Sequence, residues 1–503
     1  MRILIYTASS MCNPQLGIQM EWAMRYLNEG HEVVFCHCSG CMRACSANPN
    51  GNNALCDFCK IGFKVGLSNL PKKIKVEKLI KRKQMSEFAP QVFHSVSEIK
   101  SYKYKGIDVG FSVFSVYVSK TRNPNPLFSN TFVSCINQML FEAESLIDAA
   151  EDIIERVKPD LIIFFNGRFY DTKPFYGIAI KKGIDYITTE NIGGVRSDSE
   201  YRMVRFFNTI PHDAKQAYKN CLESWEKSTV PEEEKIRLGT EFYEKRRKGI
   251  RAGDYVYTGN QIKGKLPDSY DSQKKSIVVY CSSEDEFSSV SEYVDNMFIF
   301  KSQYLAIKYF VDHLNSEEYN FYVRIHPNMK GLDFDYHRNL YKLSAYDNVT
   351  VIGPEDPTSS YALMDIAYNI IAFGSTIGAE SLFWDKPLVL LGHADYYNWG
   401  CCQVPRTHEE ALEMVKNPII FQNAKEMSIK YGYYFLENSL AEPAKYIHIT
   451  PMVISSFGKQ VFAFDYLKLL GSAKLYRSIQ TFYNRIISKF HRNSIVFPDK
   501  IIH

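Results

Sequence analysis

The 503-residue sequence has no long hydrophobic run, no strong charge imbalance and no internal repeat. No segment approaches the ~20 apolar residues that a membrane-spanning helix needs. The net charge of +4 is small for this length and does not favour nucleic acid as a partner. The apolar start of the chain, residues 3–6, is too short for a signal peptide and predicts a first β-strand instead. We therefore expect a cytoplasmic protein, whose cysteines stay mostly reduced.

Length and composition indicate an enzyme of two domains. The hydrophobic fraction is 45% and the charged fraction 23%, which is ordinary for a globular protein. A chain of 503 residues exceeds what one hydrophobic core usually supports. A charged helical segment and a polar stretch with Gly and Pro, residues 259–275, predict the linker. We expect an N-terminal domain over 1–262, a C-terminal domain over 275–440, and a tail over 441–503.

Predicted strands alternate with predicted helices in both halves. In the first half, a strand at 3–6, a helix at 16–28 and a strand at 32–35 form a βαβ unit, and later strands lie at 161–165 and 186–189. The second half has predicted strands at 277–281, 322–325, 348–352, 369–373 and 388–391. Such alternation predicts parallel sheets, so we expect an α/β fold of two Rossmann-like domains.

The most informative segment follows the predicted strand at 369–373. Gly374 would let the backbone approach a ligand closely. Ser375 and Thr376 offer hydroxyl groups and amides where a helix begins, which suits a phosphate. Glu380 lies one helical turn further on, and we expect it to accept a hydrogen bond from a ribose hydroxyl.

His326 follows another predicted strand, within the sequence RIHPN, and can donate to a phosphate. Each feature alone has an ordinary explanation: His-Pro is usually a turn, Gly-Ser-Thr a helix cap, and Glu380 a solvated side chain. Ligands bind at the carboxyl ends of strands in open parallel sheets. Because these features follow successive strands of one predicted sheet, we favour a nucleotide mono- or diphosphate that carries a group to be transferred.

Three segments of the second half, SSEDE (282–286), RIHPN (324–328) and GSTIGAESLFWDKP (374–387), resemble the capsule polysaccharide biosynthesis proteins. The two-domain arrangement resembles the GT-B glycosyltransferase fold, in which two Rossmann-like domains face each other across a cleft. The pairing of His-Pro with Ser/Thr is shared with bacterial sialyltransferases, Kdo transferases and teichoic-acid glycerophosphotransferases. In that broader set, the His and Ser/Thr side chains hold the donor phosphate.

The resemblance implies an inverting, metal-independent glycosyltransferase that moves a sugar from a CMP- or UDP-linked donor to a glycan or lipid-linked acceptor of a capsule or lipopolysaccharide. A polyol-phosphate transferase and a non-hydrolysing sugar-nucleotide epimerase remain alternatives on the same scaffold. A metal-binding regulatory module is the alternative of a different class. The predicted donor-binding residues are Ser282, Ser283, Arg324, His326, Pro327, Gly374, Ser375, Thr376 and Glu380.

An inverting transferase needs a base to deprotonate the acceptor hydroxyl. Glu190 and Asp171 follow predicted strands of the first half and are the candidates, with Glu190 favoured because it ends its strand directly. Asn166 and Arg168 precede Asp171 and are predicted on the acceptor side. The ordinary alternatives are that Glu190 caps a turn and that Asp171 pairs with Arg168 or Lys173.

Six cysteines fall within residues 36–60, a predicted Cys-rich insertion after the second strand. Two short-spaced pairs on either side of a polar loop are typical of a metal site. We expect Cys41, Cys45, Cys56 and Cys59 to be the ligands, with Cys38 as the substitute. A zinc ion and an iron–sulfur cluster both remain open, and either would be structural rather than catalytic.

The segment 466–498 carries six Lys or Arg residues and no acidic residue, interleaved with apolar residues at helical spacing. A basic amphipathic helix can lie on an anionic membrane surface. We therefore expect either peripheral contact with the inner face of the membrane or a helix docked on the protein itself.

Overall fold

The computed structural model divides the chain into two compact units, Met1–Pro211 with Ala441–His503, and His212–Leu440. Among the helices that the structure describes, none is both long enough and apolar enough to cross a bilayer. The described residues are 1–10, 15–68, 70–80, 84–192, 202–250, 252, 256–436, 441–449, 454–456, 459–461 and 497–499.

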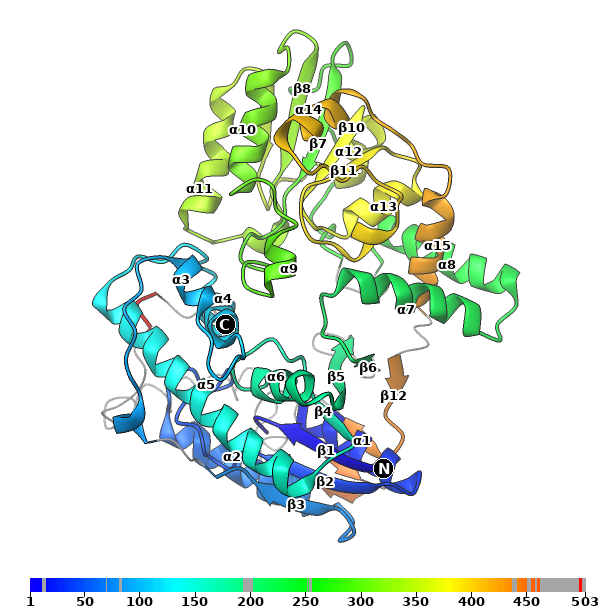
Figure 1. Cartoon of the computed structure of the whole chain (residues 1–503). Helices are drawn as coiled ribbons and strands as arrows, with labels where there is room; N and C mark the ends of the chain where they lie inside the picture. Colours follow the sequence, from blue (N-terminus) through cyan, green and yellow to red (C-terminus); the bar gives the residue numbers. More distant parts are fainter. Residues whose placement is uncertain are drawn as a thin grey trace. The chain divides into compact units, whose positions relative to one another are not determined.

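Unit 1 is built on a seven-stranded sheet (Figure 1). The five strands β3-β2-β1-β4-β5 are parallel and have the order of a Rossmann-like sheet, while β6 and β12 extend it in the antiparallel sense. The strands are β1 (Arg2–Thr7), β2 (Glu32–His37), β3 (Lys75–Lys78), β4 (Leu161–Phe165), β5 (Asp185–Ile192), β6 (Arg202–Phe207) and β12 (Ala441–Pro443).

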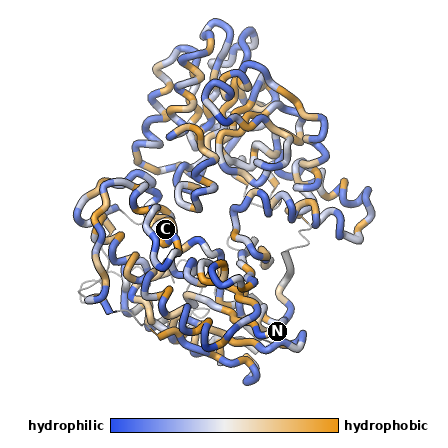
Figure 2. Tube along the Cα trace, viewed as in Figure 1, coloured by the Kyte–Doolittle hydropathy of each residue, from blue (hydrophilic) through white to orange (hydrophobic). Residues whose placement is uncertain are grey.

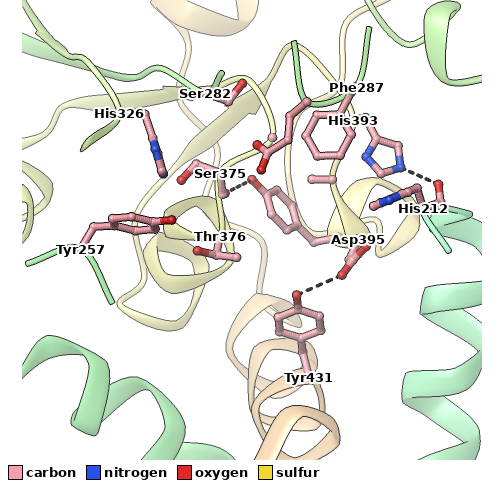
Figure 3. A pocket seen from close by; sticks show the side chains of 14 residues that line it. His212, Tyr257, Ser282, Phe287, His326, Ser375, Thr376, His393, Asp395 and Tyr431 are labelled. Atoms are coloured by element: carbon pink, nitrogen blue, oxygen red, sulfur yellow. Dashed lines mark hydrogen bonds between the residues drawn. The ribbon is translucent and has the colours of Figure 1, made fainter. Parts of the chain in front are cut away.

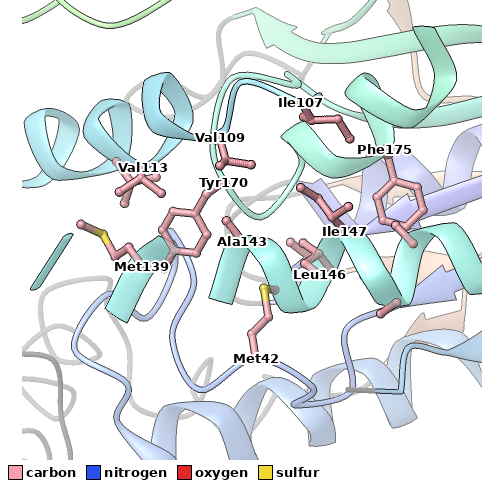
Figure 4. Close-up of a cluster of buried hydrophobic side chains, with 14 of the residues drawn as sticks. Met42, Ile107, Val109, Val113, Met139, Ala143, Leu146, Ile147, Tyr170 and Phe175 are labelled. Atoms are coloured by element: carbon pink, nitrogen blue, oxygen red, sulfur yellow. The ribbon is translucent and has the colours of Figure 1, made fainter. Parts of the chain in front are cut away.

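Helices cover both faces of this sheet because side chains alternate along each strand. Leu4 and Tyr6 of β1 join a core with the helices α4, α5 and α6, part of which is drawn in Figure 4. Ile3 and Ile5 join a second core with α1 and α2. The helices of unit 1 are α1 (Gln15–Asn28), α2 (Asn53–Leu67), α3 (Val96–Ser101), α4 (Val109–Thr121), α5 (Asn130–Val157) and α6 (Lys173–Lys182).

The segment after β12 is held on unit 1 by the buried side chain of Glu21 on α1. Its carboxylate accepts hydrogen bonds from the backbone N–H groups of Lys445, Tyr446 and Ile447, each at 2.7 Å. Three short strands then pair as a small antiparallel sheet, β13 (Ile447–Ile449), β14 (Ile454–Ser456) and β15 (Lys459–Val461). The predicted tail therefore belongs to the first unit, while its basic segment lies almost wholly outside the described residues.

Unit 2 repeats the same strand order in a five-stranded sheet, β11-β10-β7-β8-β9, and all of its pairings are parallel. Figure 2 shows hydrophobic residues concentrated along these strands. The strands are β7 (Lys275–Tyr280), β8 (Tyr319–Arg324), β9 (Val349–Ile352), β10 (Asn369–Ala372) and β11 (Leu388–Leu390). The helices are α7 (Ala214–Lys227), α8 (Glu232–Arg247), α9 (Glu292–Asp295), α10 (Gln303–His313), α11 (Asp335–Tyr341), α12 (Ser360–Ile366), α13 (Ile377–Phe383), α14 (His408–Lys416) and α15 (Ala424–Leu436).

The division between the units differs from the predicted one, because it falls after Pro211 rather than after residue 262. The charged helix α8 packs on α15 of unit 2. The Tyr243 hydroxyl donates to the Ser428 carbonyl at 2.6 Å, and a Cβ at Gly239 would lie 2.2 Å from the Ile429 carbonyl oxygen. A few small and aromatic residues of α8 make this contact, although most of its residues are charged. The high charge of this segment therefore did not mark a linker between the units.

Two Rossmann-like units in one chain confirm the predicted α/β fold and are the domain content of a GT-B-like protein. The predicted Cys-rich insertion, residues 36–60, begins at the end of β2 and reaches into α2.

Candidate functional site

A cavity of about 390 Å³ lies in unit 2, where β7, β8, β10 and β11 end at the carboxyl edge of the sheet (Figure 3). Ligands bind at this edge in open parallel sheets. Five of the nine predicted donor-binding residues line the cavity: Ser282, His326, Gly374, Ser375 and Thr376.

Gly374 is needed where the chain leaves β10. Its φ of +131° is rarely adopted by other residues, and a Cβ would lie 2.3 Å from the His393 carbonyl oxygen. The next two residues lead into α13, and the Tyr396 hydroxyl donates to the Ser375 carbonyl at 2.8 Å. The backbone is thereby fixed with the Ser375 and Thr376 side chains at the cavity wall.

His326 presents one ring nitrogen to the cavity. Its Nδ1 accepts the backbone N–H of Asn328 at 3.1 Å, so the proton of the neutral ring is on Nε2, which is a donor. The ring of Tyr257 contacts the imidazole edge-on, with 4.9 Å between centroids. Figure 3 shows His326, Ser375 and Thr376 beside one another. Pro327 does not line the cavity but begins the short turn that positions His326.

Glu380 does not line the cavity, which corrects the predicted ribose contact. The carboxylate is buried, its Oε1 accepts from Arg246 Nε at 3.0 Å, and its Oε2 accepts from the Tyr361 hydroxyl. Arg246 also donates from Nη2 to Thr376 Oγ1 at 3.3 Å. Glu380 therefore holds Arg246 against a cavity residue, and its effect on a ligand would be indirect.

Arg324 and Ser283 are also turned away from the cavity. Arg324 donates from Nη1 to the carbonyls of Gly353 and Asp356, both at 3.1 Å, and burial lowers its pKa. Ser283 is buried and donates to Asp285. Arg324 and Ser283 lie near the ends of their strands, as predicted. Their side chains point away from the cavity, however, and not toward a donor as expected.

The cavity also has residues that the sequence analysis did not single out as ligands. Asp395 accepts from the Tyr431 hydroxyl at 3.2 Å; burial raises the pKa of Asp395, and the charge of His393 opposes this. His393 donates from Nε2 to the His212 carbonyl at 2.7 Å. The sequence could have predicted these residues, because the segment HADYY (393–397) follows β11 in the same way as the segment GST (374–376) follows β10. The other lining residues are Tyr257, Glu286, Phe287, Ala394 and Tyr396.

In unit 1, Asn166 directly follows β4 and lies beside Glu190 of β5. Glu190 does not end its strand as predicted, because β5 continues to Ile192 and pairs with β6 there. The Asn166 side-chain amide donates to the Glu190 carboxylate, which is partly exposed. Asn166 has a positive φ of 54°, and its Oδ1 accepts the Arg168 backbone N–H at 3.0 Å. Arg168 itself is buried, with its Nε donating to Ser115 Oγ at 2.5 Å. A partly exposed carboxylate that is oriented by an amide suits a general base.

Asp171 is a correction to the predicted catalytic pair. Its side chain is only 1% exposed, and burial raises its pKa. Oδ2 accepts from the backbone N–H of Ser46 at 2.9 Å and from its hydroxyl at 2.6 Å. Lys173 is ion-paired with Asp108 at 3.2 Å rather than with Asp171. Asp171 thus anchors the Cys-rich insertion and is not placed to reach an acceptor.

A second cavity, of about 160 Å³, lies in the Cys-rich insertion of unit 1. Cys38, Cys45, Cys56 and Cys59 line it, whereas Cys41 lies beside Cys38 with 3.5 Å between the Sγ atoms. The hydrogen bond with Cys41, together with nearby backbone N–H groups, lowers the pKa of Cys38. Within the described ranges, no group of three or more His, Cys, Asp or Glu side chains is arranged to hold one metal ion. Of the five cysteines in the expected set, Cys38, Cys45, Cys56 and Cys59 line this cavity and Cys41 does not.

No protein-family model and no curated protein sequence matches this chain. Among solved structures, it is similar to KpsC β-Kdo 2,4 transferase of Thermosulfurimonas dismutans, with a TM-score of 0.36, 15% identity, and coverage of 61% of this chain and 86% of that one. The β-Kdo 2,7 transferase of the same KpsC has a TM-score of 0.33, 16% identity, and coverage of 56% and 80%.

UDP-GlcNAc 2-epimerase of Neisseria meningitidis, solved with UDP-GlcNAc bound, has a TM-score of 0.24, 12% identity, and coverage of 86% of this chain and 96% of that one. The fold assignment itself rests on the strand orders of the two sheets.

Proposed function

We propose that this protein is a glycosyltransferase and that the cavity of unit 2 binds its nucleotide-sugar donor. The observation that carries the proposal is the convergence of His326, Ser375 and Thr376 on one cavity at the carboxyl edge of a Rossmann-like sheet. An imidazole N–H and two hydroxyl groups are donors suited to phosphate oxygens, and they stabilise the charge that develops on a departing nucleotide.

Glu190 is our candidate for the base that removes the proton of the acceptor hydroxyl. Its carboxylate is partly exposed and is oriented by Asn166, whereas Asp171 is closed off by Ser46. In an inverting transfer, the deprotonated acceptor hydroxyl attacks the anomeric carbon of the donor sugar while the bond from that carbon to the phosphate oxygen breaks. This single displacement inverts the anomeric configuration. The base carries the proton, and the nucleotide leaves with the bonding electrons.

The class of substrate is inferred from the sequence resemblance to capsule polysaccharide biosynthesis proteins. It favours a CMP- or UDP-linked sugar as the donor and a glycan or lipid-linked acceptor of a bacterial surface polysaccharide. The three donor-binding side chains need no metal ion to contact phosphate, so we propose metal-independent transfer. The protein would act in the cytoplasm, at the inner face of the membrane where such acceptors are assembled.

The test is to follow CMP- and UDP-linked sugars by NMR with the full chain, with and without a membrane extract of the cells that make it. We expect release of free nucleotide that depends on the extract, and an inverted anomeric configuration in the product. Conversion of a UDP-sugar into its epimer without any extract would instead establish an epimerase. A product that retains a phosphate bridge to a polyol would establish a polyol-phosphate transferase.

A further inference from the structure

The cysteine-lined cavity of unit 1 takes no part in the proposed transfer. It brings together thiols from three places along the chain: Cys38 follows β2, Cys45 lies in the loop, and Cys56 and Cys59 lie on α2. The last two are three residues apart, so they lie on the same face of the helix.

Polar groups are directed at the sulfur atoms of this cavity. The backbone N–H of Ser10 donates to Cys59 Sγ at 3.3 Å, and the side-chain amide of Asn48 donates to Cys56 Sγ, also at 3.3 Å. Asn48 is itself fixed, because its Oδ1 accepts the Asn52 backbone N–H at 2.9 Å. Hydrogen bonds to cysteine sulfur are a common feature of the surroundings of metal-bound cysteines.

The loop that carries these cysteines is anchored to the unit at several points. Met42 is buried in the core of unit 1 (Figure 4), and the Arg43 backbone N–H donates to the Glu142 carboxylate at 3.0 Å. Asp171 accepts two hydrogen bonds from Ser46, next to Cys45. The loop is therefore fixed by contacts with Glu142 of α5 and with Asp171.

The four thiols line a cavity of about 160 Å³, which is more space than a single ion needs. Zn–S bonds of ~2.3 Å in tetrahedral geometry place ligand sulfurs about 3.8 Å apart around one point. Cys38 and Cys41 meet this spacing, but no three candidate ligands in the described part of the chain are arranged around one ion. In a cubane cluster, each thiolate binds a different iron, so the four sulfurs surround a larger volume.

From this geometry we propose that the cavity holds a [4Fe–4S] cluster, with Cys38, Cys45, Cys56 and Cys59 as its ligands. A cluster bound by four thiolates is anionic, and Lys120 also lines the cavity, where its charge favours such a group. Cys41 is a hydrogen-bonding neighbour of Cys38 and not a ligand.

The test is to purify the full chain without oxygen and to measure its iron, sulfide and zinc. We expect about four irons and about four sulfides per chain, with a visible absorption band that dithionite bleaches. One equivalent of zinc, or a chain without metal in which Cys38 and Cys41 form a disulfide, would overturn the proposal. This result is independent of nucleotide binding in unit 2.

Serine variants of the four ligands test the assignment. Each of Cys38→Ser, Cys45→Ser, Cys56→Ser and Cys59→Ser should lose most of the iron. Cys135→Ala is the matched control, because Cys135 is a buried thiol of the same unit on α5, and it should keep the cluster.

Cys41→Ser separates the two candidate ligand sets. Because Cys41 does not line the cavity, we expect this variant to keep its iron. Loss of the cluster in Cys41→Ser, with retention in Cys38→Ser, would show that Cys41 and not Cys38 is the ligand. If a serine variant fails to fold, the metal content and electron paramagnetic resonance spectrum of the reduced wild-type chain still decide whether a cluster is present.

Discussion

At the scale of single residues, burial decides what a polar group does at the end of a strand. Glu380 and Asp171 were predicted to meet a ligand, and the structure encloses both. Their carboxylates are used to hold Arg246 and Ser46, respectively. Sequence position identifies the edge of the sheet, but the direction of a side chain depends on residues far away in the chain, such as Arg246 on α8.

Replacing Glu380 with Gln tests its role as a positioning residue. Arg246 is 4% exposed, and its buried charge would lose the carboxylate with which it is ion-paired, so we expect unit 2 to lose about 3–5 kcal/mol of unfolding free energy. Urea unfolding measures this loss. The control is Glu413→Gln, which breaks an exposed pair with Lys416 and should change stability by less than about 0.5 kcal/mol. Equal effects of the two variants would contradict the assignment.

At the scale of elements, the loops that follow the strands contain ionisable groups with shifted pKa values. The loop between β7 and α9 contains Glu284. Burial raises the pKa of Glu284 from 4.5 to about 7, and its Oε1 accepts the Gln303 backbone N–H at 2.6 Å. At a pH between 4.5, the ordinary pKa of Glu, and about 7, the pKa of Glu284 in the folded chain, the folded chain binds more protons at this position than the unfolded chain does. The contribution of Glu284 to stability is therefore full below pH ~4.5 and is lost as the pH rises to about 7.

Glu284→Gln should remove this pH dependence. The wild-type chain should lose on the order of 3 kcal/mol between pH ~4.5 and ~7 through this residue, and the variant should not. Urea unfolding of both chains at pH 5 and pH 7.5 gives the comparison. Parallel pH profiles would show that Glu284 titrates normally.

Glu190 on β5 carries the prediction about catalysis. Glu190→Gln keeps the hydrogen-bonding shape beside Asn166 but removes the basic carboxylate. We expect kcat to fall by about 10²–10⁴-fold while donor affinity stays unchanged. Asp171→Asn is the comparison, because it should loosen the Cys-rich insertion without removing a base. An active Glu190→Gln enzyme would eliminate Glu190 from this role.

At the scale of the whole molecule, hydrophobic periodicity predicted the two Rossmann-like sheets and the position of the Cys-rich insertion. It did not predict the boundary between the units, because the packing of α8 on α15 depends on small contacts such as Gly239 against Ile429. His326, Ser375 and Thr376 were predictable because strand order alone brings them to one edge. His393 and Asp395 follow the same rule after β11, directly behind Gly392, so the same reasoning could have identified them.

The most direct test of the donor site is a thermal-shift measurement of the full chain with CMP, CDP, UDP, GDP and dTDP. One nucleotide should raise Tm, because a ligand at about 100 times its Kd stabilises the folded state by ~2.7 kcal/mol. The shift should disappear in His326→Ala and shrink in Ser375→Ala, whereas His313→Ala, which changes an exposed histidine on α10, should keep it. No shift with any nucleotide, or an equal shift in wild type and His326→Ala, would contradict a donor site at this cavity.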